Sequence, residues 1–338
     1  MEVTEQAHVA VGDPSAVGKA RRVAADLARR AGLAEADRGR VAIVVTEAAT
    51  NLVKHAGRGD LFLRRLEYRG TGGVAMLALD RGPGIANVGA ALRDGFSSAG
   101  TAGHGLGAIA RLSTAWDVYS TPGGGAAVFA RIAPPAAAEE RGLAVGGLAV
   151  PCPGEDVSGD AWSASERDGR TAVLVADGLG HGAPAAEAAR AAVGLFGAHA
   201  DESPAALVAR IHAGLQATRG AAVAVAEVDP RRRLVRFAGI GNIGAAILAD
   251  GATRRLVSQH GTAGHGRPSI REFTYPWPDD AVFVAHSDGL VSDWTLARYP
   301  GLLRKPPMLL AGILYRDFKR GRDDVSVVVA RATARAAA

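Results

Sequence analysis

The sequence predicts an α+β protein with two domains, and three observations support this prediction. The chain has 338 residues, which is longer than a single hydrophobic core usually serves. Residues 1–132 show helical and strand patterns that would form one sheet backed by helices. Residues 142–333 show many short strand patterns with few helices, and a segment rich in Pro and Ala at 133–141 reads as the linker.

Composition restricts the class of protein and its partners. Hydrophobic residues make up 48% and charged residues 22% of the chain, which is typical of a folded globular protein. The 39 basic and 34 acidic residues leave a net charge of +5, too small an excess to predict a nucleic-acid partner. The densest basic run, Arg231–Arg236, lies between two strand patterns, so we interpret it as a hairpin turn.

Cysteine content and hydropathy indicate where the chain would work. Cys152 is the only cysteine, which excludes a disulfide within the chain and a zinc site built from several cysteines. The first residues show no basic segment followed by an apolar one, so we expect no signal peptide. No apolar run approaches the roughly 18 residues that suggest a membrane helix. We therefore expect a cytoplasmic protein without a membrane partner.

The elements of the first domain follow from their boundary residues. A strand at 7–11 precedes Asp13 and Pro14, a capping residue and a first-turn proline that begin a helix ending near Gly32. A second helix covers 34–56, with Gly57 as its C-cap. Then come strands at 60–68 and 73–80, a glycine-rich region at 82–107, a short helix at 106–112, and strands at 115–120 and 126–132.

The second domain contains short apolar runs that we interpret as strands. They are 143–150, 171–177, 221–229, 233–240, 244–250, 281–288 and 324–331. Helical patterns occupy 183–199, 203–218 and 304–319.

Three segments of the first domain carry polar residues in unusual positions. Glu47, Asn51 and His55 recur at steps of four in "TEAATNLVKHA", which places them on one helical face. Asp80 ends a strand and is followed by "RGPGI", and glycines precede the short helix in "GTAGHGLGAIARL". Taken singly, each has an ordinary explanation: a solvated helix face, a turn or a loop.

Taken together, the three segments predict a nucleotide site. Free backbone N–H groups at a helix N-terminus bind phosphates, and glycines allow close approach. Asp80 would accept a hydrogen bond from an adenine amino group. The amide oxygen of Asn51 suits Mg²⁺, and Glu47 one turn earlier would act as a general base. His55 is close to Gly57, where a histidine also suits the C-terminus of a helix.

The order "E-x-x-x-N", "D-x-G-x-G-I" and "G-x-G-L-G" resembles the GHKL superfamily of gyrase, Hsp90, histidine kinases and MutL. The segment "TEAATNLVKHAGRGDLFL" is most similar to RsbT-like serine kinases and anti-sigma kinases of bacterial partner-switching pathways. The resemblance implies a Bergerat-type α/β two-layer sandwich that binds ATP and Mg²⁺. It assigns Glu47 as catalytic base, Asn51 as Mg²⁺ ligand and Asp80 as adenine contact. The implied loop positions are Gly82, Gly84, Gly103, Gly105 and Gly107.

A histidine kinase is not expected, although it shares these motifs. Such an enzyme needs a dimerising helical segment with a phospho-acceptor histidine before the ATP domain. The residues before the second helix read as one strand and one helix, and His8 lies in the strand.

In the second domain, acidic residues follow or precede apolar strands. Asp160, Asp177 and Asp288 stand at such positions, as does the pair Asp323–Asp324. One Asp-Gly pair is an ordinary turn, but several carboxylates at the ends of neighbouring strands favour a cluster of hard divalent ions. Two ions about 4 Å apart can activate water for in-line displacement at phosphorus. Cys152 lacks the arginine spacing of a cysteine phosphatase loop, and no other nucleophilic side chain is evident.

Five motifs, "GEDVSGDAW", "VADGLGHGAPAAEAA", "GIGNIGAAIL", "HSDGLVSDW" and "RDDVSVVVAR", resemble the protein phosphatase 2C superfamily in its SpoIIE and RsbX branch. The resemblance implies an α-β-β-α sandwich holding two Mn²⁺ or Mg²⁺ ions. The implied ligands are Asp160, Asp177, the Gly178 carbonyl, Asp288 and Asp323, with Asp177 also catalytic and Asp324 ranked behind Asp323.

Other residues of the second domain have open or minor roles. Gly241 and Asn242 would shape a turn near the site. His181 would either meet the substrate phosphate or a metal-bound water, or cap the next helix, while His265 and His286 are taken as structural. No arginine stands out as a phosphate clamp.

These expectations combine into a bifunctional regulator. The first domain would phosphorylate Ser or Thr on a STAS-domain antagonist or stressosome-type protein, and the second would hydrolyse phosphoserine or phosphothreonine in the same pathway. One alternative is a first domain that binds ATP and a partner, such as a sigma factor, without transferring phosphate. Another is a phosphatase domain that serves only as a scaffold.

Overall fold

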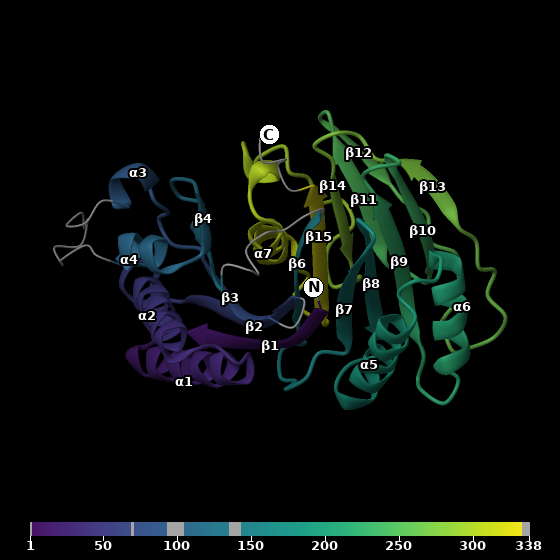
Figure 1. Cartoon of the computed structure of the whole chain (residues 1–338), viewed down its shortest axis with the longest axis horizontal. Helices are drawn as coiled ribbons and strands as arrows, with labels where there is room; N and C mark the ends of the chain where they lie inside the picture. Colours follow the sequence, from purple (N-terminus) through teal and green to yellow (C-terminus); the bar gives the residue numbers. More distant parts are fainter. Residues whose placement is uncertain (1, 69–70, 93–104, 135–142, 333–338) are drawn as a thin grey trace. The chain divides into compact units, whose positions relative to one another are not determined.

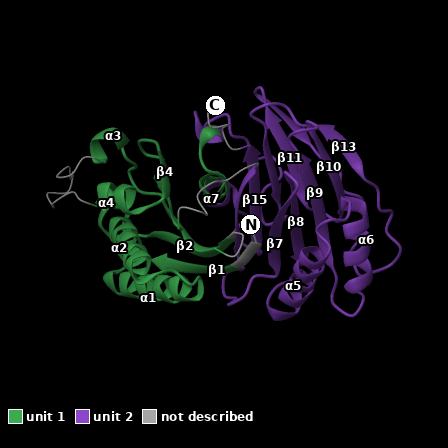
Figure 2. Cartoon of the chain, in the orientation of Figure 1, with its two compact units in different colours: residues 1–139, 304–313 green, residues 140–303, 314–338 purple. Residues whose placement is uncertain are grey.

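The computed structural model describes residues 2–68, 71–92, 105–134 and 143–332. The chain divides into two compact units (Figure 2). Unit 1 comprises Met1–Glu139 and Arg304–Ile313, and unit 2 comprises Glu140–Leu303 and Leu314–Ala338. Most of the linker expected at 133–141 lies outside the described residues. The inclusion of Arg304–Ile313 in unit 1 was not expected from the sequence.

Unit 1 is built on a five-stranded antiparallel sheet in the order β1-β2-β3-β5-β4 (Figure 1). Its elements within Met1–Glu139 are β1 Glu2–Val11, α1 Pro14–Arg30, α2 Glu35–Asn51, a π-helical turn Leu52–Ala56, β2 Gly59–Tyr68, β3 Thr71–Asp80, α3 Val88–Ala91, α4 Gly105–Leu112, β4 Ala115–Ser120 and β5 Ala126–Ile132.

The boundaries of helix α1 match their sequence signals. The Asp13 carboxylate accepts hydrogen bonds from the backbone N–H groups of Ser15 and Ala16, and Pro14 takes the first helical position. At the other end, Gly32 has a φ of 69°. A residue in this left-handed region ends many helices, and glycine adopts it without the strain of a Cβ atom.

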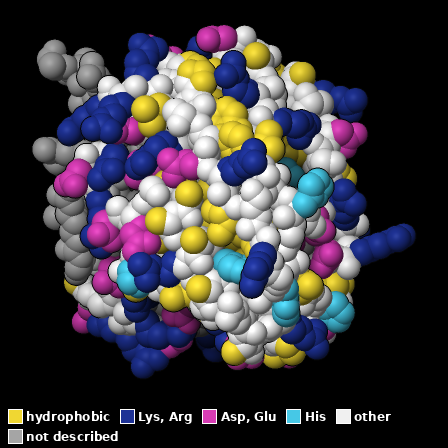
Figure 3. Space-filling view, turned by 90° about the vertical axis from the view of Figure 1, so that its right-hand side faces the viewer, with side chains coloured by type: hydrophobic (Ala, Val, Ile, Leu, Met, Phe, Trp, Pro, Cys, Tyr) yellow, Lys and Arg dark blue, Asp and Glu magenta, His cyan; other side chains and the backbone are white. Residues whose placement is uncertain are grey.

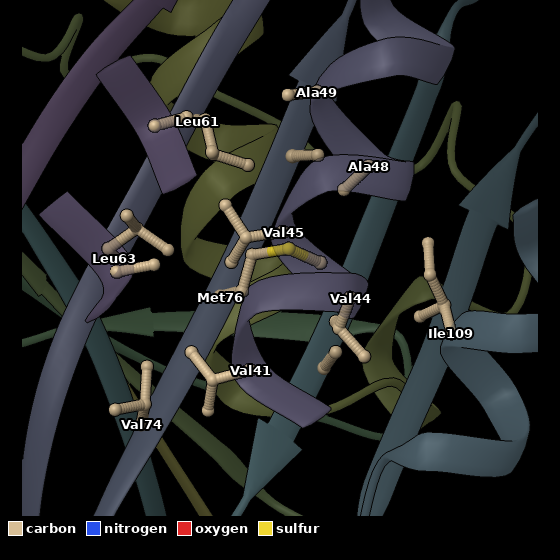
Figure 4. Packing of buried hydrophobic residues seen from close by; sticks show 14 of the residues in the cluster. Val41, Val44, Val45, Ala48, Ala49, Leu61, Leu63, Val74, Met76 and Ile109 are labelled. Carbon is tan, nitrogen blue, oxygen red and sulfur yellow. The ribbon is translucent and has the colours of Figure 1, made fainter. Parts of the chain in front are cut away.

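The core of unit 1 lies between the helices and the sheet (Figure 4). Helix α2 presents buried residues at steps of three and four from Val41 to Ala49, which form one apolar stripe. This stripe packs against Leu61 and Met76 of the sheet and against Ile109 of α4. Because the packing fixes the rotation of α2, the half-buried Glu47 is held at the border of the core.

Unit 2 contains two five-stranded sheets in the orders β13-β10-β9-β8-β7 and β12-β11-β14-β15-β6. In chain order, its strands and helices are β6 Leu143–Val150, β7 Asp160–Arg167, β8 Arg170–Gly178, α5 Ala183–Ala198, α6 Pro204–Gly214, β9 Ala221–Asp229, β10 Leu234–Ile240, β11 Gly244–Ala249, β12 Ala252–Arg255, β13 Phe273–Pro276, β14 Val282–His286 and β15 Val325–Ala332. A 3-10 turn Leu302–Arg304 and helix α7 Pro307–Phe318 lie between β14 and β15 and are divided between the two units.

Helices α5 and α6 cover the sheet that contains β7 to β10, and their apolar residues share one core with it (Figure 1). The two sheets approach closely where β6 meets β7. A Cβ atom on Gly147 would lie 2.8 Å from the Trp162 ring, so only glycine fits this position as the strands now stand. Trp162 itself is buried.

The basic run of unit 2 forms the predicted hairpin between β9 and β10. The Asp229 carboxylate accepts hydrogen bonds from the backbone N–H groups of Arg231 and Arg232. The Arg236 guanidinium donates to Glu227 at 2.7 Å. On the face drawn in Figure 3, basic and acidic side chains are intermixed. Within the described residues, no helix combines the length and apolarity needed to cross a bilayer.

Candidate functional sites

The polar pair of helix α2 faces the first residue of helix α4. A Cβ atom on Gly105 would lie 3.0 Å from Asn51 Oδ1 and 3.1 Å from Glu47 Oε2. The structure therefore brings together Glu47, Asn51 and Gly105, as the sequence predicted. Gly107 follows in the same helix and is buried. Gly103 lies outside the described residues.

Asp80 ends strand β3 at the edge of the same unit. Its Oδ1 atom accepts hydrogen bonds from the N–H groups of Gly82 at 2.8 Å and Ala126 at 3.1 Å. Gly84 has a φ of 75°, and a Cβ atom there would lie 2.2 Å from the Thr121 carbonyl oxygen. These contacts hold the loop after β3 against β5 and fix the direction of the Asp80 carboxylate.

His55 has different surroundings from Glu47 and Asn51, the two residues that precede it at intervals of four. It lies in the π-helical turn Leu52–Ala56, which replaces the α-helical step of four by a step of five. His55 is exposed, whereas Glu47 and Asn51 are half-buried. Gly57 follows with a φ of 75° and ends the helix. His55 is thus a residue of the helix end, as the sequence indicated.

The acidic residues of unit 2 come from both sheets. Asp160 and Asp177 are cross-strand partners of β7 and β8, so their side chains project from the same face. Asp288 follows β14, and Asp323 precedes β15, which pairs with β14. The backbone N–H of Gly178 donates to the Gly159 carbonyl at 3.0 Å and joins the loops beside Asp160 and Asp177.

These carboxylates change one another's protonation. Burial raises the pKa of Asp177 to about 7, and the negative charges of Asp288, Asp323 and Asp324 contribute. Burial also raises the pKa of Asp160 well above its usual value, with a further contribution from Asp177. The predicted metal-binding aspartates therefore share one electrostatic environment.

The pKa of Asp288 is raised overall, although some of its neighbours raise it and others lower it. Burial and the charge of Asp323 raise it, whereas the charge of Arg320 and a hydrogen bond from Asn242 lower it. Asn242 Nδ2 donates to Asp288 Oδ2 at 2.7 Å, which places the predicted Gly241–Asn242 turn at the site.

The chemistry of this cluster fits a hard divalent cation. Asp160 Oδ2 and Asp324 Oδ2 are buried and have no hydrogen-bond partner within the described part of the chain. A buried, unpaired carboxylate oxygen is costly unless a cation or a proton compensates it. As they stand, no three Asp, Glu, His or Cys side chains among the described residues are close enough to ligate a single ion. The carboxylate oxygens are therefore of the type that binds Mg²⁺ or Mn²⁺, but their positions are not those of a complete coordination sphere.

Several contacts around the cluster were not predicted from the sequence. Asp324 is buried, and its Oδ1 accepts a hydrogen bond from the Cys152 N–H at 2.8 Å. His181 Nδ1 lies 2.6 Å from Glu155 Oε1. Helix α5 begins after Gly182 without a side-chain cap, so the alternative that His181 caps this helix is wrong.

The buried His286 has a structural environment. Its Nδ1 pairs with the Ser287 carbonyl at 2.7 Å, and its Nε2 accepts a hydrogen bond from Trp294 Nε1 at 3.0 Å. Burial lowers its pKa, which keeps the ring neutral and able to accept from Trp294.

Comparison with known families gives one match in each half of the chain. Residues 11–131 match the histidine kinase-like ATPase domain, and residues 167–333 match the stage II sporulation protein E (SpoIIE) family. Asp160 lies just before the second matched segment, while Asp177, Asp288 and Asp323 lie inside it.

Individual relatives agree with both matches. The serine/threonine-protein kinase RsbT of Bacillus subtilis (strain 168) is 32% identical over 111 residues, which are 33% of this chain and 84% of RsbT. A solved structure described as a bacterial stressosome system that controls secondary messenger signalling is 30% identical. It covers 57% of this chain and 100% of its own, with a TM-score of 0.52. RsbX in complex with magnesium shares the fold at 19% identity, covering 58% of this chain and 98% of its own, with a TM-score of 0.50.

These matches confirm the α+β class, with a GHKL-type domain followed by a protein phosphatase 2C-type domain. The first matched segment contains Glu47, Asn51 and Gly105, and the second contains Asp177, Asp288 and Asp323. The chain belongs to the RsbT family through its histidine kinase-like ATPase domain, and it joins to that domain a SpoIIE domain of the protein phosphatase 2C type.

Proposed function

We propose that the protein is a bifunctional partner-switching regulator. Unit 2 would hydrolyse phosphoserine or phosphothreonine on a partner protein, and unit 1 would phosphorylate Ser or Thr on a partner of the same pathway. The observation that carries the phosphatase half is the meeting of carboxylates from both sheets, with the pKa of Asp177 raised to about 7. The RsbT and stressosome likenesses support a STAS-domain antagonist as the partner, with a sigma factor as the alternative.

In the phosphatase, the carboxylates would hold two Mg²⁺ or Mn²⁺ ions through Asp160, Asp177, Asp288, Asp323 and the Gly178 carbonyl. Bound divalent ions supply an activated water and neutralise charge on a phosphoryl group. Asp177 loses its proton when it becomes a ligand, because only the carboxylate binds a cation well. Asn242 orients Asp288 by its hydrogen bond. Water attacks phosphorus, and the Ser or Thr oxygen leaves with a proton.

A phosphopeptide assay tests this half. With Mn²⁺ or Mg²⁺, the wild-type protein should release phosphate from a phosphoserine peptide. Asp177→Asn should lose at least about 100-fold in kcat/KM, which corresponds to roughly 2.7 kcal/mol of transition-state stabilisation. Glu47→Gln, in the other unit, should keep full activity. Equal turnover by wild type and Asp177→Asn would show that Asp177 has no part in the mechanism. If the wild-type protein released no phosphate, the alternative that unit 2 serves only as a scaffold would be favoured.

In the kinase, Glu47 would accept the proton of the partner's hydroxyl while that oxygen attacks the γ-phosphorus of ATP and ADP leaves. Asn51 would hold Mg²⁺ through its amide oxygen, and Asp80 would contact adenine. Gly105 brings the start of α4 against the Glu47 and Asn51 side chains, so phosphates bound at that helix would meet both residues.

Transfer of labelled γ-phosphate to the partner tests this half. Wild type should label the partner, Glu47→Gln should bind ATP but label it at least about 100-fold more slowly, and Asn51→Ala should bind ATP·Mg²⁺ weakly. Partner binding and ATP binding by wild type without any transfer would favour the alternative of a non-catalytic binding module.

A further inference from the structure

We infer that Arg219 and Arg320 form a clamp for the phosphoryl group at the carboxylate cluster of unit 2. The inference rests on the proposed phosphatase function and names the residues that would recognise its substrate. The sequence showed no such arginine, because Arg219 precedes β9 and Arg320 follows α7, away from the motifs that contain Asp177 and Asp288.

Arg219 is held against the loop that follows Asp177. The Gly220 carbonyl accepts a hydrogen bond from the Leu179 N–H at 3.0 Å, which ties the two loops together. A Cβ atom on Gly180 would lie 3.3 Å from the Arg219 guanidinium, so this side chain lies over the loop. The Arg219 carbonyl also pairs with His265 Nε2 at 2.9 Å, which fixes the backbone from the other side.

Arg320 is held in the same way beside Asp288. Its N–H donates to the Gly289 carbonyl at 2.8 Å, and the N–H of Val291 donates to the Phe318 carbonyl at 3.0 Å. Arg219 therefore borders the loop that follows Asp177, and the backbone of Arg320 lies against Gly289, the residue after Asp288.

Both guanidinium groups are available to a ligand. Each residue is exposed, and neither forms an ion pair with a carboxylate in the described part of the chain. By contrast, Arg210, Arg236 and Arg316 are paired with neighbouring acids. A phosphate monoester that approached the aspartates would be repelled by their charge. Guanidinium groups at the rim offer paired N–H donors of the geometry that phosphate oxygens accept.

The chain offers a matched control at the opposite end of the same sheet. Arg231 lies over the β7–β8 turn, with its guanidinium carbon 3.3 Å from a Cβ atom on Gly169. That turn joins Arg167 to Arg170, whereas Asp160 and Asp177 pair at the other end of the two strands. Arg231→Ala therefore removes an exposed arginine on a glycine turn without touching the cluster.

The test is calorimetric titration of the full-length protein with inorganic phosphate in Mg²⁺ buffer. Removal of one charge-assisted contact at an exposed rim should weaken phosphate binding about tenfold in Arg219→Ala and in Arg320→Ala. Arg219→Lys should recover part of the loss, and Arg231→Ala should bind like wild type. In a phosphoserine-peptide assay, KM should rise in the two alanine variants more than kcat falls.

The outcomes separate the clamp from the phosphatase function. A wild type that hydrolyses the peptide, with Arg219→Ala and Arg320→Ala binding phosphate as tightly as wild type, overturns the clamp alone. A wild type that binds phosphate through these arginines but hydrolyses nothing supports the clamp and overturns the function. A wild type that neither binds phosphate nor hydrolyses the peptide overturns both. Unchanged melting temperatures of the variants show that any loss is not due to unfolding.

Discussion

At the scale of single residues, the protonation of Asp177 links the candidate metal centre to stability. Its pKa is raised from 3.8 to about 7 by burial first and then by Asp288, Asp323 and Asp324. The folded protein thus holds this proton more tightly than the unfolded chain. Such a group stabilises the fold fully below its unfolded pKa, and the contribution is lost as pH rises through the folded pKa.

We therefore expect the metal-free protein, in excess chelator, to become less stable as the pH rises from about 4 to about 7. Thermal unfolding followed by circular dichroism would measure this. Mn²⁺ should restore stability at the higher pH, because a bound cation replaces the proton. Asp177→Asn should flatten the pH dependence, and Glu47→Gln should retain it. An identical slope in Asp177→Asn would assign the effect to other groups.

Some residues of the two sites were predicted from the sequence because their signals are local. Glu47 and Asn51 are one helical turn apart, and Asp80 stands next to its own glycine loop. Arg219, Arg320 and Glu155 were not predicted as site residues, and the contact between Glu155 and His181 was not predicted either. Their contacts join segments distant in sequence, and no periodicity encodes such a contact.

At the scale of elements, strand β8 and helix α5 meet at a glycine. A Cβ atom on Gly178 would lie 2.1 Å from the Ala185 carbonyl oxygen, so Gly178→Ala must move either the strand or the helix. We expect a loss of about 1–3 kcal/mol in the free energy of unfolding, the usual range for overpacking. Urea unfolding would measure it.

Gly194 provides the control for this substitution, since it lies in α5 and an added Cβ would meet no atom within 4 Å apart from its neighbours in the chain and the backbone of its own helix. Gly194→Ala should stabilise the protein by about 0.4–1 kcal/mol, because alanine has less freedom to lose in a helix. If the two substitutions changed the free energy of unfolding equally, β8 and α5 would be able to move apart at Gly178 without loss of stability.

The sequence did not predict those secondary-structure elements that are determined by contacts with other parts of the chain. Strand β7, "DAWSASER", has too many polar residues for an apolar run, and its pairing with β8 defines it. The segment expected as one helix at 34–56 divides into α2 and a π-helical turn. The step of five has no sequence signal of its own, whereas the helix end at Gly57 was predicted by residue type.

At the scale of the whole molecule, each unit contains a cluster of buried hydrophobic residues of its own. A ligand that binds only the folded form stabilises its own unit by mass action, by about 2.7 kcal/mol at 100 times its Kd. We expect ATP·Mg²⁺ and Mn²⁺ to act on different parts of the calorimetric unfolding profile. Asn51→Ala should abolish the shift caused by ATP, and Asp160→Asn the shift caused by Mn²⁺.

Each variant should leave the other shift intact, and this crossed pattern is the internal control. If Asp160→Asn also removed the ATP shift, the nucleotide and the cation would act on a single cooperative unit. The sequence predicted two domains from their different patterns, but it did not predict that unit 1 includes Arg304–Ile313. That segment lies far along the chain from the remainder of unit 1.

The close approach of Gly147 to Trp162 has a spectroscopic consequence. Trp162 stands two residues after Asp160 on β7, so its indole and the carboxylate leave the strand on the same side. The glycine lets the indole pack against β6, where it is buried. The protein thus contains its own fluorophore beside the acidic cluster. The emission of this one indole, isolated by replacing the other three tryptophans with phenylalanine, would report cation binding without any added label.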